Sequence, residues 1–308
     1  MRQGRLGWLI VSLGLGLGLS LGLALGLPLG LPLGSAGRPV QAGSGEELAP
    51  AYRVDLFGDV AVAGVGLRGV GTGTIQLENV PAGAQVVKAL VYWATLGKSN
   101  SFASLTLNGV KVGGSLIGTA GPVGWGESGN FSYQAEVTHL VPGNGSYEVG
   151  MLPAGTDPAR EEASQGAALV VLYVQAGAPH RTVIVNHGAV ALTPDFPIYT
   201  DTIAGYNSGD SMAGARATYL VADGQVEWPD GDLTLAGAVI ASNIFSATDG
   251  PYWDSPSLNV EGLAVSKPFT TTINRNVAGV ADRDRLVWVA TVFSAGSNGR
   301  TYLPAMLR

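Results

Sequence analysis

After residue 52 the sequence consists of short runs of Val, Leu, Ile, Thr and Tyr, separated by glycine, proline and asparagine. Such runs predict β-strands, because most helices need a longer and differently spaced apolar pattern. The dipeptide Asn108-Gly109 tolerates positive φ, as a tight hairpin requires. The runs at 167–174 and 286–293 are apolar on both faces, which is typical of the central strand of a sandwich. The pattern predicts an all-β fold.

Several segments recur about 128 residues later in the chain, which indicates an internal repeat. LTLNGV from Leu105 matches LTLAGA from Leu233 in kind, and three further pairs follow the same order: 51–62 with 179–190, 90–93 with 217–220, and 124–125 with 252–253. We therefore expect two tandem β-sandwich domains, jelly-roll or immunoglobulin-like, at residues 51–178 and 179–303.

The N-terminus has the pattern of a secretory signal. Arg2 and Arg5 precede a stretch without charge at 6–37, in which a Leu-Gly dipeptide repeats. Glycine and proline weaken a helix, so this stretch resembles a signal segment more than a transmembrane helix. We expect a signal peptide at 1–42, cleaved after Ala36 or Ala42, and a linker at 43–50. An uncleaved leader that anchors the chain in a membrane is the alternative.

Charge and cysteine usage exclude several classes of function. The formal net charge is −6, and the leader holds some of the arginines, so the remainder is more acidic still. An acidic surface repels phosphate backbones, which argues against a nucleic-acid partner. The chain has no cysteine, so disulfides, thiolate metal sites and cysteine nucleophiles are excluded. An exported chain of this kind depends on its apolar cores for stability.

Six segments resemble a family of secreted and surface proteins of bacteria and archaea that is a domain of unknown function. They are 86–97, 105–119 with the following Trp125, 131–141, 166–174, 249–254 and 284–294. Members of that family often precede repeated adhesin-like modules. The resemblance implies a β fold and a surface location, and it implies no activity.

No catalytic signature is present in the sequence. It lacks the G-x-S-x-G nucleophile elbow, a phosphate-binding loop and the H-E-x-x-H zinc motif. His180 and His187 are expected on one strand and, seven residues apart, should point to opposite faces. Glu161 and Glu162 are neighbours in an expected loop, where adjacent carboxylates diverge instead of facing one another across a sugar. We therefore expect a protein that is not an enzyme.

The acidic loops of the second repeat are the candidate binding sites. Calcium binds oxygen ligands, and the candidate ligands are carboxylates of Asp249, Asp254, Asp230 and Asp232. Alternatively, Tyr252 and Trp253 stack on a sugar ring. In the simplest interpretation, the Asp-Gly and Gly-Pro pairs form turns and Trp253 fills the sandwich core, as Trp125 would in the first repeat.

Taken together, these features predict a non-catalytic exported protein of the cell surface or envelope, secreted or periplasmic, with a structural or adhesion-type role. Its partner would be an envelope component, a glycan or a protein, and it would touch a membrane only through an uncleaved leader. No cofactor is expected, apart from the calcium alternative. A carbohydrate-binding module that uses Tyr252 and Trp253 is the first alternative, and a secreted hydrolase with a dispersed site is the second.

Overall fold

The computed structural model describes residues 47–123, 128–156, 162–206, 212–263, 268–276 and 284–297. In these ranges the chain forms strands and a single short 3-10 helix, with no α-helix. The first strands are β1 (Ala49–Gly66), β2 (Gly73–Leu77), β3 (Gln85–Leu96), β4 (Ser104–Leu107), β5 (Val110–Gly113), β6 (Ser115–Ala120), β7 (Asn130–Glu136), β8 (Gly145–Gly150) and β9 (Ala163–Val174). The helix η1 (Thr138–Leu140) lies between β7 and β8. The all-β fold predicted from the sequence is confirmed.

The remaining strands follow after a short turn. They are β10 (His180–Leu192), β11 (Ile198–Ile203), β12 (Arg216–Ala222), β13 (Asp232–Leu235), β14 (Ala238–Ser242), β15 (Trp253–Asp254), β16 (Ser257–Asn259), β17 (Phe269–Asn274) and β18 (Leu286–Gly296). Within the described ranges, no helix has the length and apolar character needed to cross a membrane. The predicted signal peptide at 1–42 lies outside the described residues.

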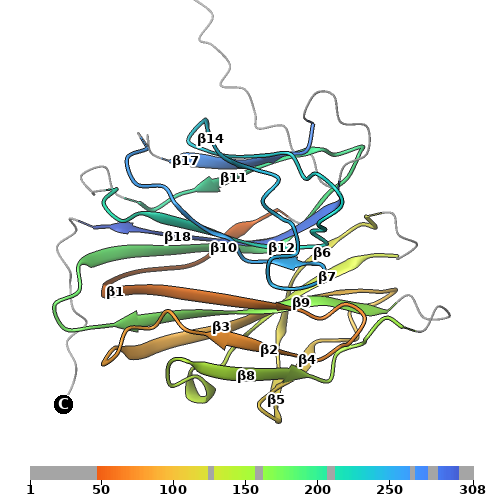
Figure 1. The fold of residues 1–308 in the computed structure, drawn as a ribbon, viewed down its shortest axis with the longest axis horizontal. Coiled ribbons are helices and arrows are strands. Elements are labelled where there is room, and N and C mark those ends of the chain that lie inside the picture. The colour runs from red at the N-terminus through yellow and green to blue at the C-terminus, as the bar shows by residue number, and fades with distance from the viewer. Residues whose placement is uncertain are drawn as a thin grey trace, which may run out of the picture. The chain divides into compact units, whose positions relative to one another are not determined.

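The strands form three antiparallel sheets. The largest has the order β15-β12-β18-β10-β1-β9-β3-β7-β6, with β16 also paired to β12. One small sheet has the order β2-β8-β4-β5 and the other β11-β17-β13-β14. Figure 1 shows β11, β14 and β17 beside β10, β12 and β18, and it shows β2, β4, β5 and β8 beside β1, β3 and β9. Each small sheet thus covers one part of the large sheet.

We call β1–β9 the first half and β10–β18 the second half. In the large sheet, β1-β9-β3-β7 of the first half has its counterpart in β10-β18-β12-β15/β16 of the second. The small sheets correspond in the same way, and the repeated LTL segments lie on β4 and β13, which occupy equivalent positions. Both halves belong to one compact unit, so the division into separate domains near residue 178 stays a prediction.

Strand β1 joins the two halves because it is long enough to pair with both. Its first part pairs with β10 from Ala49 to Phe57, and its second part pairs with β9 from Gly58 onward. Gly58 lies at the point where the partner changes, and a Cβ there would be 1.9 Å from the carbonyl oxygen of Tyr173. The close approach of the two backbones therefore requires glycine at this position.

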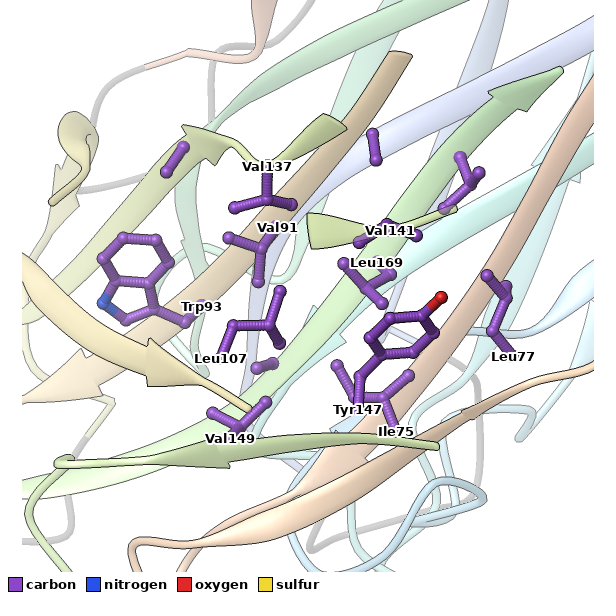
Figure 2. Close-up of a cluster of buried hydrophobic side chains, with 14 of the residues drawn as sticks. Ile75, Leu77, Val91, Trp93, Leu107, Val137, Val141, Tyr147, Val149 and Leu169 are labelled. Atoms are coloured by element: carbon purple, nitrogen blue, oxygen red, sulfur yellow. The ribbon is translucent and has the colours of Figure 1, made fainter. Parts of the chain in front are cut away.

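Three apolar clusters hold the sheets together. One packs the small sheet of the first half on the large sheet, around Trp93, Val91, Leu107 and Leu169 (Figure 2). A second does the same in the second half, around Trp288. The third, which we call the shared core, lies between the halves and contains residues of β1, β3, β9, β10, β12 and β18. Burial of apolar side chains on both faces explains why 167–174 and 286–293 carry almost no polar residue.

Candidate functional site

Trp253, one of the two predicted stacking residues, is completely buried. It belongs to the shared core, and its ring lies against the backbone of Gly166 on β9, where a Cβ would be 2.4 Å from Cγ of the indole. Gly64 on β1 approaches the same ring, with 2.8 Å between a Cβ placed there and Nε1. Trp253 thus fills a space between the halves, and a sugar has no open face of this ring on which to stack. Its predicted equivalent, Trp125, lies outside the described residues.

Tyr252, the other predicted stacking residue, already has a cation on its ring. The guanidinium carbon of Arg68 lies 4.2 Å from the ring centroid. The same guanidinium donates hydrogen bonds from Nη2 to the side chain of Gln165 and to Oδ1 of Asp223, the latter at 3.1 Å. Arg68 and Gln165 belong to the first half, whereas Asp223 and Tyr252 belong to the second. This group therefore ties the halves together, and one face of Tyr252 is covered.

The carboxylates of the same loop are used within the protein. Asp254 is completely buried, and its Oδ1 accepts hydrogen bonds from the backbone N–H of Thr248 at 2.7 Å and from its hydroxyl at 2.9 Å. Asp249 accepts a hydrogen bond from the hydroxyl of Ser255 at 2.5 Å. Both carboxylates hold the loop in shape, because they satisfy N–H and O–H groups that the loop would otherwise leave unpaired.

The other two predicted calcium ligands point to different environments. Asp230 is buried and accepts a hydrogen bond from the N–H of Phe245, whereas Asp232 is only partly buried and accepts one from the hydroxyl of Ser242. Within the described ranges, no group of three or more histidine, aspartate or glutamate side chains is arranged to hold a metal ion. The four carboxylates are thus not brought together as one calcium site.

Burial has a large effect on the acids of the second half. Desolvation raises the pKa of Asp230 and of Asp254 to about 6, and a neighbouring carboxylate adds to the effect in each case. Asp284 was not singled out in the sequence. Desolvation, together with the charges of Asp223 and Asp230, raises its pKa to about 8. Like Asp230 and Asp254, Asp284 has a structural role: it accepts hydrogen bonds from the backbone N–H groups of Gln225 and Arg285.

A different place on the molecule has the form of a binding site. We call it the seam groove: an open pocket of about 320 Å³ where β1 and β10 meet β3, β7 and the turn between β5 and β6. Its polar and aromatic lining consists of Tyr52, Lys88, Tyr92, Ser115, Gln134, Glu136 and His187. Pockets that hold small ligands have volumes of about 300 to 1,000 Å³, so the seam groove is of a size for one small ligand.

The bottom of the seam groove is formed by Tyr92 and His187. The Tyr92 hydroxyl oxygen lies 3.4 Å from Nδ1 of His187, and the two rings meet edge to face at 5.9 Å between centroids. Burial lowers the pKa of His187, since desolvation disfavours the imidazolium. Burial raises the pKa of the Tyr92 hydroxyl. Both groups are therefore neutral at neutral pH and offer hydrogen-bonding atoms without charge.

The rim of the groove carries one charge of each sign. Nζ of Lys88 lies 2.6 Å from Oε2 of Glu136. The same ammonium lies 5.3 Å from the ring centroid of Tyr52, which is half-buried on β1. Because the ion pair cancels and the bottom is neutral, the groove has no net charge to attract an ion.

Sequence reasoning did not find this groove. Tyr92 and His187 are 95 positions apart, and they lie on strands that pair with different partners. His180 and His187 lie on one strand, β10, as expected, but the sequence did not indicate that His187 is half-buried at the seam. One local signal was present: Lys88 interrupts an otherwise apolar run at 86–94. A charged side chain in such a run indicates a position where the strand reaches the protein surface.

No known protein-family model matches this sequence, and no curated protein matches it. The resemblance to a domain of unknown function therefore stays a prediction from the sequence.

Proposed function

We propose that this chain is a non-catalytic interaction protein, exported to the cell surface or envelope, with a structural or adhesion-type role. The observation that supports this proposal is the way the two halves are joined. Strand β1 pairs into both, and the shared core fills the space between them. A body made in this way resists shear between its halves, which suits a protein that presents surfaces to partners.

Ion pairs to the buried Asp59 add to the joint between the halves. Asp59 on β1 accepts from Arg216 on β12 at 2.8 Å and lies 3.2 Å from Nε of Arg181 on β10. The hydroxyl of Ser294 on β18 donates to the same carboxylate at 2.5 Å. The oxygens of this largely buried carboxylate thus have donors from three strands of the second half. The contacts of Asp59 and those of Arg68 both join the first half to the second, which supports the proposal that the protein is one rigid scaffold.

Export and envelope binding together test the proposal. The full chain, expressed with its leader in a bacterial host, should be recovered outside the cytoplasm with a new N-terminus after Ala36 or Ala42. The exported protein should then sediment with isolated cell envelopes and be released by an excess of unlabelled protein. Retention in the cytoplasm, or an exported protein that never sediments with envelopes, would contradict it.

A further inference from the structure

We propose that the seam groove binds one uncharged hexopyranose residue at the end of a glycan. This inference rests on the proposed interaction function, since it names the chemical class of the partner. Its basis is a pocket of about the size of a single sugar. The pocket combines the half-buried ring of Tyr52, the uncharged polar groups of Tyr92 and His187 at the bottom, and the Lys88–Glu136 ion pair at the rim.

Charge selects the class of ligand. A phosphate or carboxylate ligand needs uncompensated cations, and the one lysine of the groove is paired with Glu136. A cationic ligand would need a free carboxylate, and Glu136 is held by Lys88 and by the hydroxyl of Thr138. The groove therefore favours a neutral ligand rich in hydroxyl groups.

The lining matches the two kinds of surface on a pyranose. The Lys88 ammonium lies over the Tyr52 ring at 5.3 Å from its centroid, and the part of this half-buried ring that stays accessible can pack against the C–H face of the sugar. The half-buried amide of Gln134 has no hydrogen-bond partner in the described part of the chain, and it offers both a donor and an acceptor to adjacent hydroxyls. At the bottom, the half-buried imidazole of His187 offers a hydrogen-bonding atom to a sugar hydroxyl, and the completely buried Tyr92 lies behind it, with its hydroxyl 3.4 Å from Nδ1.

The position of the groove explains why one terminal residue is the ligand. The pocket is open on the solvent side, where Gly113 and Ser115 are exposed, and it is closed at the bottom by Leu90 and Tyr92 of the shared core. A single ring enters, and the rest of the glycan extends into solvent. A ligand with about a dozen non-hydrogen atoms in such a site is expected to bind with a Kd near 1 mM.

The experiment is a titration of the exported protein with neutral methyl glycosides. The probes are methyl α-D-glucopyranoside, methyl α-D-mannopyranoside, methyl β-D-galactopyranoside and methyl N-acetyl-β-D-glucosaminide, followed by NMR or calorimetry. At least one should bind saturably. Tyr52→Ala and Gln134→Ala should each weaken that binding by about tenfold or more, because each removes a contact that the sugar makes directly.

Matched controls separate the groove from the rest of the surface. Phe57→Ala removes an exposed aromatic ring from the same strand β1 but outside the groove, and it should leave binding unchanged. Tyr52→Leu keeps the apolar packing of Tyr52 in case Tyr52→Ala impairs folding, and it should also lose binding. Glu136→Gln leaves Lys88 uncompensated and should allow methyl β-D-glucuronide to bind, which the unmodified protein should reject.

Failure of this inference can be told apart from failure of the proposed function. The inference is overturned if no neutral glycoside binds, or if binding persists unchanged in Tyr52→Ala, Tyr52→Leu and Gln134→Ala. If envelope binding survives in these variants without competition from the glycosides, the interaction function stands and the groove is not its site. If a glycoside binds in the groove but envelopes do not bind, the groove inference stands and the envelope role fails.

Discussion

The first half, β1–β9, and the second half, β10–β18, arrange their paired strands in the same order, yet they bury different side chains. Among the described residues, the first half buries one acid, Asp59, and that acid faces arginines of the second half. The second half buries several ionisable side chains of its own: Asp201, Asp223, Asp230, Asp254, Asp284 and Arg275. Strand order therefore does not dictate the chemistry of an interior, because alternating apolar residues are enough to specify the pairing.

Part of the difference lies at the edge of the large sheet. In the first half, β7 runs without interruption beside β3, and β6 extends the sheet by another strand. In the second half, the equivalent edge is divided into β15 and β16; β15 itself carries Trp253 and the buried Asp254, and the loop before it supplies Asp249. The divided edge admits buried carboxylates that hold loops, whereas the continuous edge needs none. The second half should accordingly be the more sensitive to pH.

The largest effects on stability are expected from substitutions in the shared core and in the core of the first half. Trp253→Ala and Trp93→Ala each remove a fully buried indole, and each should lower the free energy of unfolding by about 3 to 5 kcal/mol. Because Trp253 packs against both halves, its loss should shift the whole calorimetric transition and not that of the second half alone. An unchanged melting curve for Trp253→Ala would show that this core is not shared.

A second comparison concerns two arginines of the first half, Arg68 and Arg53, whose ion pairs are buried to different degrees. Arg68→Met removes a cation from the completely buried Asp223, and it should cost about 3 kcal/mol, since removal of one partner leaves a desolvated charge. Arg53→Met breaks a more exposed pair with Asp55 and should cost about 1 kcal/mol or less. Urea unfolding measures both, and equal effects would contradict the role given to the Arg68 group.

The pH dependence should come from the second half. Burial raises the pKa of Asp284 to about 8, so the folded protein keeps a proton that the unfolded chain has already lost. Stability contributed by this proton is present at low pH and is lost as pH rises, by about 2 kcal/mol between roughly pH 6.5 and 8. Urea unfolding at these two pH values measures the loss. Asp284→Asn should flatten the dependence, and a stability that increases over this range would refute the assignment.

The smallest effect is expected at Trp228, which is 38% exposed in the loop between β12 and β13. Trp228→Ala should change the free energy of unfolding by no more than about 0.5 kcal/mol, because a surface substitution removes few packing contacts. It is the matched control for Trp253→Ala, since both remove an indole from the second half. A loss comparable to that of Trp253→Ala would contradict the exposed position of Trp228.

Local pattern was sufficient to predict much of the strand content. The runs at 167–174 and 286–293 lie in β9 and β18, which are buried on both faces. Asn108 and Gly109 adopt the positive φ values of 48° and 78° that their dipeptide predicted, and they join β4 to β5. These features depend on residues close in the chain, so period and turn chemistry reveal them.

The candidate site could not be predicted in this way. The loop at 249–254 has the composition of an exposed turn, yet its Trp253 and Asp254 are completely buried, because β9 and β12 of opposite halves close over it. The seam groove likewise combines Tyr52, Lys88 and His187 from strands of both halves.

What the sequence by itself determined is therefore the all-β class, several of the strands with the runs buried on both faces, and the turn at Asn108-Gly109, since these follow from neighbours along the chain. Only the tertiary structure decided that β1 changes partner at Gly58 and that the two halves share a core. The same packing decided which polar groups are desolvated. Burial and pairing depend on residues distant in the chain, and a local pattern contains no information about which of them will meet.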